Sequence, residues 1–458
     1  MQPRELADKI CYTLRDSGHQ AYLVGGCVRD ILLERQPLDY DVSTDATPEQ
    51  VTRIFPHSLT VGAQFGVVIV TEDSFADGAI DRPEGTKPAQ VEVATFRSDI
   101  GYSDGRHPDR VVYAKSPQDD VKRRDFTINA LLLDPATKEV LDFVGGRADL
   151  RAGIVRAIGD PAQRFGEDKL RMVRAVRFAA RFHYEIEPGT LRAIQTLAPA
   201  VRQVSPERLR DELTKLLTEG AARRGFELLS DASLLLQLLP EIARMKGVPQ
   251  PPQFHPEGDV WNHTLLMLDG LPPGCSPTLA WGVLLHDVGK PATFKPPLGP
   301  NDRIRFDEHV HVGELMAGEI CHRLRFSGAD TQQILALVAN HMRFIDVPRM
   351  KPATLKRFVR LDHFDEHLEL HRLDCLSSHG MFDSYDEVRR FVSETPPDQV
   401  RPPRLLTGDD LKALGFQPGP KFKEILSATE DAQLNGAIHS REEALRFVLS
   451  QYGSTLKQ

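Results

Sequence analysis

The spacing of hydrophobic residues changes once along the chain, and this change limits the folds that the chain can adopt. The first 145 residues alternate short β-branched runs, such as AYLVGG and GVVIV, with helical stretches and with breaks at glycine, proline or aspartate. After Gly166 the segments have helical spacing, as in EDKLRMVRAVRFAARF, and strand-like alternation almost disappears. The sequence therefore predicts an α+β protein in which a domain with a small sheet precedes a helical remainder.

Two proline-rich stretches interrupt the helical part, VPQPPQFHPEG at residues 248–258 and SETPPDQVRPP at residues 393–403. The first has the character of a linker before a histidine-rich region, and eleven of the sixteen histidines lie between His255 and His379. Because 458 residues exceed one typical domain, several domains are expected. We predict four parts, named the head, the neck, the body and the tail: residues 1–146, 147–247, 248–392 and 393–458.

The composition is that of a soluble globular protein, with 41% hydrophobic and 27% charged residues. The five cysteines form no CxxC pair, and the start MQPRELADKI contains no apolar signal core. No apolar stretch approaches the roughly 18 residues that are needed to cross a bilayer. We therefore expect a cytoplasmic protein that does not associate with membranes.

The net charge of −8 is unusual for a protein that binds nucleic acid, but the positive charge is concentrated locally. Between Arg147 and Phe182 there are nine Lys or Arg residues and four acidic residues. An exposed, ion-paired helix face would explain this cluster, and so would a surface that binds phosphates.

A glycine pair, Gly25-Gly26, lies between a strand-like run and a helical stretch in LVGGCVRDILL. Without Cβ atoms in the way, backbone amides at such a turn can approach a phosphate, and Arg29 adds a cation nearby. Turn geometry alone is the alternative explanation of the glycines.

Asp39 and Asp41 lie two residues apart in a strand-like segment, so their carboxylates should point to the same face. Like charges that close repel unless a divalent cation bridges them, although a surface pair or an Asx turn remains an alternative. Glu92, between core-facing Val91 and Val93, could complete the site. Three acids around Mg²⁺ suit phosphoryl transfer.

Further motifs follow in order: RRDFTINAL at residues 123–131, DFVGG at 142–146, EDKLR at 167–171 and SPERLRDELTKLL at 205–217. Together with GGCVRD and DYD, they resemble the bacterial class II tRNA nucleotidyltransferase and poly(A) polymerase family. The C-terminal GDDLKALGFQPGPKFKEIL resembles the tail of this family, so the resemblance covers nearly the whole chain. It implies a polymerase-β-type head followed by an all-helical neck, body and tail.

The resemblance implies an enzyme that adds C, C and A to the 3′ end of tRNA from CTP and ATP, without a nucleic-acid template and with release of pyrophosphate. Asp39, Asp41 and Glu92 would be catalytic, and the two aspartates would hold Mg²⁺. The implied nucleotide-binding residues are Gly25, Gly26, Arg29, Arg123, Arg124, Asp125, Asn129, Asp168, Arg171, Arg174 and Arg177.

In the family, the helix with the ED-x-x-R motif selects the incoming base, which here involves Glu167, Asp168 and Arg171. Residues three apart are neighbours on one helix face. Cytosine and adenine both present an amino donor beside a ring-nitrogen acceptor, which an Asp acceptor and an Arg donor can match. Uracil and guanine present the opposite pattern and would leave polar groups unpaired. A surface ion pair is the alternative.

Two segments of the head, one between Thr71 and Gln90 and one at residues 102–111, can be compared with the corresponding parts of the family. Residues 102–111, YSDGRHPDRV, correspond to the flexible loop that the family uses to switch from C to A addition. The residues between Thr71 and Gln90 are longer and more acidic than expected, and we interpret them as a surface insertion without an assigned role.

The histidine-rich body contains His263, the adjacent His286-Asp287, and Asp374, which resemble the H…HD…D pattern of HD-domain metal phosphohydrolases. His309 and His341 lie where longer HD sites add ligands, so a dinuclear site is one alternative. The resemblance implies a divalent metal of unknown identity and a phosphatase or 2′,3′-cyclic phosphodiesterase activity. A metal-free site that only holds RNA is the other alternative.

Several functions remain open at the level of the sequence. A poly(A) polymerase shares the motifs, and an enzyme that adds only A is not excluded. From another class, the chain could be an HD phosphohydrolase or an RNA-binding protein with a vestigial head. The expected partners are tRNA, CTP and ATP, and the oligomeric state is unknown.

Overall fold

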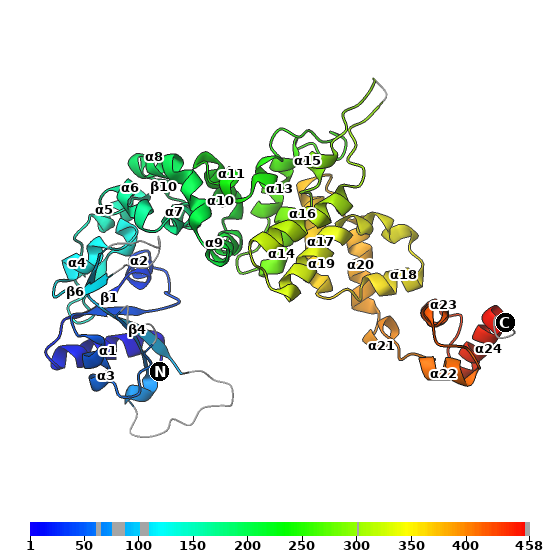
Figure 1. The fold of residues 1–458 in the computed structure, drawn as a ribbon, viewed down its shortest axis with the longest axis horizontal. Coiled ribbons are helices and arrows are strands. Elements are labelled where there is room, and N and C mark those ends of the chain that lie inside the picture. Colours follow the sequence, from blue (N-terminus) through cyan, green and yellow to red (C-terminus); the bar gives the residue numbers. More distant parts are fainter. Residues whose placement is uncertain (61–65, 76–87, 101–109, 300–301, 454–458) are drawn as a thin grey trace. The chain divides into compact units, whose positions relative to one another are not determined.

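The computed structural model describes residues 1–60, 66–75, 88–100, 110–299 and 302–453. They form two compact units, Met1–Ala243 and Arg244–Gln458, each considered by itself (Figure 1). Most of the predicted 102–111 loop and most of the insertion between Thr71 and Gln90 lie outside the described residues.

A six-stranded mixed sheet is the centre of the first unit, with the strand order β3-β4-β2-β1-β7-β8. The central β2 pairs antiparallel with β1 on one side and parallel with β4 on the other. This confirms the small sheet that the alternating pattern predicts. The strands are β1 (Ala21–Val24), β2 (Asp41–Thr44), β3 (Val67–Thr71), β4 (Gln90–Thr95), β7 (Leu132–Leu133) and β8 (Val140–Leu141), beside a separate hairpin of β5 (Arg97–Ile100) and β6 (Arg110–Tyr113).

Helices cover one face of this sheet, where α1 (Pro3–Asp16) contacts β1, β2 and β4. Its residues Leu6, Ile10 and Leu14 are fully buried at the spacing of one helix face. The opposite side of β2 therefore remains available for polar residues. The other elements of the head are α2 (Gly26–Leu32), α3 (Pro48–Ile54), η2 (Glu72–Phe75), α4 (Pro117–Lys122) and η3 (Thr127–Asn129).

Beyond the sheet, the first unit is helical apart from two short parallel strands, β9 (Ile154–Val155) and β10 (Glu185–Ile186). The central helix α7 (Leu170–Phe182) packs against α9 (Pro206–Thr218) and α10 (Ala222–Asp231). The remaining helices are α5 (Gly146–Ala152), α6 (Pro161–Glu167), α8 (Pro188–Leu197), η4 (Ala198–Gln203), α11 (Leu235–Leu238) and α12 (Pro240–Ala243).

The second unit is helical, and α14 (Pro277–Leu285) is its centre, since seven of its nine residues are buried. It contacts α13 (Val260–Asp269), α17 (Gly328–Asn340) and α19 (Phe364–Ser377). None of the helices in the described residues is both long and apolar enough to span a membrane. The other helices are α15 (Lys290–Thr293), α16 (His309–Arg323), η5 (His341–Arg349), α18 (Pro352–Phe358), α20 (Asp383–Glu394), α21 (Pro397–Val400), α22 (Gly408–Ala413), α23 (Pro420–Leu434) and α24 (Arg441–Tyr452).

The DFVGG motif begins α5. Both carboxylate oxygens of Asp142 accept backbone N–H bonds, Oδ1 from residues 144–146 and Oδ2 from residue 147, which satisfies the free donors of the first turn. Gly146 packs so tightly that a Cβ atom there would overlap the carbonyl oxygen of Thr127. The second glycine of the motif is therefore required by close packing.

We expect Gly146→Ala to destabilise the first unit by about 2–4 kcal/mol, because a backbone carbonyl cannot yield to the added methyl group. Denaturant unfolding would measure the change. The matched control is Gly166→Ala in α6, where a Cβ atom meets nothing within 4 Å and alanine favours the helix. Equal stabilities of the two variants would contradict the packing argument.

Candidate functional site

The glycine turn brings an arginine of the RRD-x-x-x-N element and a carboxylate of the predicted metal site together. Gly25 caps α2 with φ 79°, a left-handed value that glycine adopts without strain. A Cβ atom at this position would lie 3.3 Å from Arg124 Nη1 and 3.9 Å from Asp41 Oδ2. Gly25 thus lets a guanidinium group and a carboxylate approach the same turn.

The three predicted catalytic acids lie at one end of β2 and β4. Asp41 begins β2 and is in register with Glu92 of β4, while Val91 and Val93 point into the core as predicted. Asp39 precedes the strand, so the prediction that both aspartates lie on one strand is wrong for this residue. Its carboxylate nevertheless acts on Asp41 through space.

Burial and the carboxylate of Glu92 raise the pKa of Asp41 to about 6, against the opposing charge of Arg124 and with a further contribution from Asp39. Burial and the neighbouring acid disfavour the ionised form of Asp41, and a divalent cation would stabilise this form. Clustered carboxylate oxygens are suitable ligands for such a cation. The donor set therefore fits the predicted metal.

The raised pKa of Asp41 predicts that the metal-free protein loses stability as the pH rises. Since about 6 exceeds the ordinary 3.8, the folded state binds more protons between these values. The stabilisation is present at acidic pH and is lost as the pH rises through 6, an effect on the order of 2 kcal/mol. In a chelator, we expect Asp41→Asn to raise Tm by roughly 5 °C at pH 8. An equal rise at pH 4 would contradict this cause.

The two arginines of the RRD-x-x-x-N element are held by one buried carboxylate. Asp120 is fully buried and binds Arg123 at 2.7 Å and Arg124 at 3.0 Å. Burial alone would raise the pKa of Asp120, but the two guanidinium groups outweigh burial and lower it. Asn129 accepts a 2.6 Å hydrogen bond from Arg29, which is itself buried. Asp120, which has no role in the sequence-based prediction, thus fixes both arginines.

The ED-x-x-R segment differs from the prediction in its local structure. Helix α6 ends at Glu167, Asp168 is extended, and α7 begins at Leu170, so Asp168 and Arg171 do not share one helix face. The break arises because Asp168 Oδ1 accepts the N–H of Leu170, in the manner of a helix cap. Both side chains still reach the same cavity.

The ion pairs of this segment also differ from a simple Asp–Arg pair. Arg171 Nη1 lies 3.0 Å from Glu167, and Asp168 Oδ2 lies 2.7 Å from Arg208 of α9. Arg208 belongs to the SPERLRDELTKLL motif, for which no residue role is predicted. The structure therefore adds Arg208 as the residue that orients Asp168.

The arginines of α7 are ion-paired, as one reading of the basic cluster proposes. Arg174 binds Asp125 at 2.7 Å, and burial, which favours the neutral acid, is outweighed by Arg174 so that the pKa of Asp125 falls to about 2. Arg177, only 5% exposed, binds Glu212 at 2.7 Å and Glu219 at 3.1 Å. Arg177 is therefore part of a buried ion-pair network.

One cavity of about 690 Å³ joins these groups within the first unit. This volume is within the usual range for small-molecule sites. All of the predicted nucleotide-binding residues and both aspartates line it, and Glu92 does not. The lining residues absent from the prediction are Leu38, Leu170, Phe178, Arg181, Arg208, Lys215 and Glu219.

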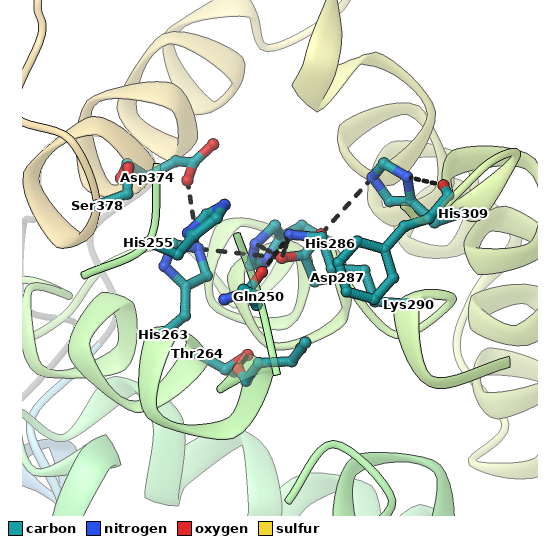
Figure 2. Close-up of polar contacts among 12 residues, drawn as sticks. Gln250, His255, His263, Thr264, His286, Asp287, Lys290, His309, Asp374 and Ser378 are labelled. Carbon is teal, nitrogen blue, oxygen red and sulfur yellow. Dashed lines mark hydrogen bonds and ion pairs between the residues drawn. The ribbon is translucent and has the colours of Figure 1, made fainter. Parts of the chain in front are cut away.

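The second candidate site lies in the body and is centred on Asp287 (Figure 2). Its Oδ2 is 3.1 Å from Nε2 of His286 and 4.0 Å from Nε2 of His263. Its Oδ1 is 3.8 Å from Nε2 of His309 and 3.7 Å from Nε2 of His341. Helix α19 adds Asp374, 3.3 Å from Nε2 of His263. The structure thus brings together all six predicted residues.

The rings are oriented as metal ligands usually are. Nδ1 of His286, His309 and His341 is hydrogen-bonded to the backbone carbonyl three residues earlier, at 2.7–2.9 Å. This leaves each Nε2 directed at Asp287, and within the described chain these buried nitrogens have no hydrogen-bond partner. Burial lowers the pKa of His341 to about 4, which keeps the neutral, ligating form.

Residues 248–258, predicted to be a linker, pack against this site. Glu257 Oε1 accepts from Nδ1 of His263 at 2.7 Å and contacts Nδ1 of His255 at 2.9 Å. A carboxylate behind a ligating histidine is a common second partner at metal sites. The role of Glu257 was not predicted. The one indication of it in the sequence is that this acid, in HPEG, lies next to the histidine-rich region.

The described residues contain three groups whose ligand atoms lie within 4.8 Å of one another: His255, Glu257 and His263; His263, His286 and Asp287; and Asp287, His309 and His341. Asp287 belongs to two of them, with one oxygen toward each. The body therefore contains candidate metal-binding groups.

Three family descriptions match successive parts of the chain. The poly A polymerase head domain matches residues 21–156, the probable RNA and SrmB-binding site of polymerase A matches residues 183–246, and the HD domain matches residues 260–367. The last match includes His263, His286, Asp287, His309 and His341, and excludes Asp374 and the 248–258 segment.

Solved structures and curated relatives extend the similarity to the full chain. The crystal structure of the Bacillus stearothermophilus CCA-adding enzyme in complex with CTP is 26% identical, with a TM-score of 0.72 over 100% of this chain and 99% of that chain. Poly(A) polymerase I of Salmonella typhi is 39% identical over 253 residues, 52% of this chain and 51% of that enzyme.

Other curated CCA-adding relatives are matched over 49–62% of their own length. The CCA-adding enzyme of Levilactobacillus brevis, in contrast, is 40% identical over 447 residues, which are 96% of this chain and 96% of that enzyme. With an identity of this size over nearly the full length, and with the head, RNA-binding and HD matches in the same order, the chain belongs to the family of CCA-adding enzymes.

Proposed function

We propose that this protein is a tRNA nucleotidyltransferase that adds C, C and A to the tRNA 3′ end from CTP and ATP, without a nucleic-acid template. The observation that carries this proposal is the cavity that joins Asp39 and Asp41 with Asp168 and with arginines of the head and the neck. The relative of known structure with 26% identity was solved with CTP, which agrees with a nucleotide in this cavity.

In the proposed reaction, the 3′-hydroxyl of the RNA attacks the α-phosphate in line, an O–P bond forms, the bond to the β-phosphate oxygen breaks, and pyrophosphate leaves. Asp39 and Asp41 would hold Mg²⁺, with Glu92 as a further acid beside Asp41. The bound ion would supply charge for the triphosphate oxygens and lower the pKa of the attacking hydroxyl. Arg124, fixed by Asp120 beside the glycine turn, would bind phosphate oxygens, since a guanidinium group suits bidentate contact.

Asp168 and Arg171 would select the base. Asp168 would accept from the amino group of cytosine or adenine and Arg171 would donate to the neighbouring ring nitrogen. The 2.7 Å ion pair with Arg208 and the 3.0 Å pair between Arg171 and Glu167 would fix the two side chains before the nucleotide enters. Preorganised groups discriminate because the wrong base leaves them unpaired.

The four-part division into residues 1–146, 147–247, 248–392 and 393–458 is part of the proposal, as is a cytoplasmic location. The head would perform the chemistry, the neck would select the nucleotide, and the neck, body and tail would bind tRNA through its shape and backbone.

The decisive experiment supplies tRNA that lacks its 3′ CCA with each labelled nucleotide separately and with CTP and ATP together, and sequences the product ends. We expect C, C and A to be added in this order. Addition of A alone to tRNA that ends in CC would indicate the partial enzyme. Long A tails on arbitrary RNA would instead indicate a poly(A) polymerase, to which the chain is also related.

A second proposed function is metal-dependent phosphohydrolysis in the body, with a phosphatase or 2′,3′-cyclic phosphodiesterase as the candidate activity. The convergence of buried, unpartnered Nε2 atoms of the body histidines on Asp287 favours it, because such atoms are destabilising unless an ion binds them. His263, His286, Asp287 and Asp374 would hold one divalent ion, and Asp287, His309 and His341 would hold a second.

We expect Asp287→Asn to lower phosphohydrolysis of a 2′,3′-cyclic nucleotide at least about 100-fold, since it removes a charged ligand shared by both metal positions. Nucleotide addition should remain, because the carboxylates for that reaction lie in the other unit. Asp307→Asn, an exposed acid paired with Lys295, is the matched control. Loss of both activities in the Asp287 variant would indicate a metal that only supports the fold.

A further inference from the structure

A glutamine and a lysine lie beside Asp287 and have no role in the reactions described above. Gln250 belongs to the 248–258 segment and lies outside the part of the chain that matches the HD domain, whereas Lys290 begins α15. In Figure 2 their side chains meet next to Asp287, between the rings of His263 and His309. Gln250 is 2% exposed and Lys290 is 7% exposed.

The segment that carries Gln250 is fixed at both of its ends. Pro249 and Asp259 form an isolated β-bridge, and the N–H of Gln250 donates to the carbonyl of Gly258 at 3.3 Å. Asp259 also accepts the N–H of Gly247 at 2.7 Å. The closed loop presents Gln250 to the site in a defined position.

Lys290 is a buried cation at this place. Its Nζ donates a 2.7 Å hydrogen bond to Gln250 Oε1 and forms a 2.7 Å ion pair with Asp287 Oδ2. An ammonium group has three N–H donors, and burial is unfavourable for each donor that lacks an acceptor. These two contacts use two of the three donors, which leaves one N–H of the ammonium for a further acceptor in the site.

Gln250 has an unpaired donor next to the same cation. Its Oε1 is taken by Lys290, and its buried Nε2 makes no hydrogen bond to any described residue. A buried polar atom without a partner costs about 1–3 kcal/mol, so its presence at a site indicates that a ligand supplies the acceptor.

The chemistry of that ligand follows from the groups that face it. An ammonium and an amide N–H₂ offer only donors and a positive charge, so the ligand must bring negatively charged oxygen acceptors. The adjoining histidines and carboxylates are suited to divalent ions, and a phosphate group can contact a metal and organic donors simultaneously through separate oxygens.

We propose that Gln250 and Lys290 form an anion subsite that binds the non-bridging oxygens of a phosphate ester at the HD site. The subsite deepens the second function proposed above and rests on it. The ammonium of Lys290 attracts the anion, and the amide N–H of Gln250 donates to one of its oxygens and fixes its orientation, so that the ester phosphorus lies next to Asp287. Both residues are substrate-binding groups in this assignment.

Neutralisation of Asp287 by Lys290 is the competing explanation, and two substitutions separate it from anion binding. Gln250→Glu keeps the oxygen that accepts from Lys290 but replaces the free donor by a negative oxygen. Lys290→Met keeps the length and apolar part of the side chain and removes the charge. The matched control is Lys295→Met, since Lys295 is exposed and pairs with Asp307 at 3.0 Å.

The test uses the full chain and inorganic phosphate as the probe, with calorimetric titration in Mn²⁺ and again in a chelator. Metal content is measured by elemental analysis of the same samples. Any phosphate binding in the head is the same in all variants, so differences between variants report binding in the body. We expect both subsite variants to bind phosphate at the body site at least tenfold more weakly, with unchanged metal content and with Lys295→Met equal to the wild type.

Phosphate binding equal to that of the wild type in both subsite variants would overturn the proposal. It would also be overturned if metal content fell in parallel with phosphate binding, because Lys290 would then only support the ligands. If the wild type holds no metal in the body, the proposed hydrolase function fails. The titration in chelator still decides the subsite, since a selective loss of phosphate binding in the two variants supports it and equal binding refutes it.

Discussion

Asp41→Asn is expected to reduce nucleotide addition by at least about 10³-fold, since it removes a charged metal ligand from a reaction that depends on electrostatic stabilisation of the triphosphate. The substitution keeps the shape of the side chain and removes the charge that burial and Glu92 oppose. The fold should therefore persist, and the metal-free variant should unfold at a higher temperature than the wild type. Single-turnover addition of C to tRNA lacking CCA would measure the rate.

The matched control for this prediction is Asp119→Asn. Asp119 is a half-exposed acid in the first turn of α4, paired with Lys122 at 3.3 Å, and it does not line the cavity. Its activity should equal that of the wild type. If Asp41→Asn retained more than a tenth of the wild-type rate, the proposed metal site at β2 would be wrong.

Asp168→Ala is expected to remove most of the discrimination between CTP and UTP, lowering the ratio of their kcat/KM values by about 10²-fold or more. The acceptor for the amino group is lost, so a base with a carbonyl at that position is no longer left unpaired. The measurement is kcat/KM for all four nucleotides, each with tRNA lacking CCA. An unchanged ratio would show that another group reads the base.

Arg208 provides a second test of the same idea. Arg208→Met removes the 2.7 Å partner of Asp168 and leaves Asp39, Asp41 and Asp168 themselves unchanged. We expect it to lower the CTP to UTP ratio by about tenfold, because the carboxylate of Asp168 is less well fixed. The neighbouring Arg210, which pairs with Asp211 on the exposed side of α9, is the matched control. Equal effects of Arg208→Met and Arg210→Met would contradict a positioning role.

Patterns that depend on the backbone alone could be predicted from the sequence. Period-two alternation placed Val91 and Val93 in the core and Glu92 on the other face, and the register of β4 with β2 confirms this placement beside Asp41. The change from strand-like to helical spacing likewise predicted the small sheet and the helical remainder. Such features follow from local geometry, which does not require knowledge of distant residues.

The spacing of hydrophobic residues gave a wrong helix boundary where a side chain accepted a backbone hydrogen bond. The regular spacing of EDKLRMVRAV predicts one helix through Asp168. In the structure the Asp168 carboxylate accepts the N–H of Leu170, and two residues separate the end of α6 at Glu167 from the start of α7 at Leu170. Aspartate is a common helix-capping residue, so the sequence contains a signal for a helix start near Asp168. The partner of Asp168, forty residues away on α9, could not have been identified from spacing.

The sequence by itself determined the fold class and most residues of both candidate sites, because the motifs name side chains whose chemistry is specific. Only the tertiary structure shows which charged side chains are held in ion pairs and which line the two sites. It paired Arg177 with the buried Glu212, assigned Asp120 and Arg208 as supports, and folded the proline-rich 248–258 stretch against Asp287. Ion pairs and unpaired donors depend on atoms brought together from distant parts of the chain, and local sequence patterns do not encode these distances.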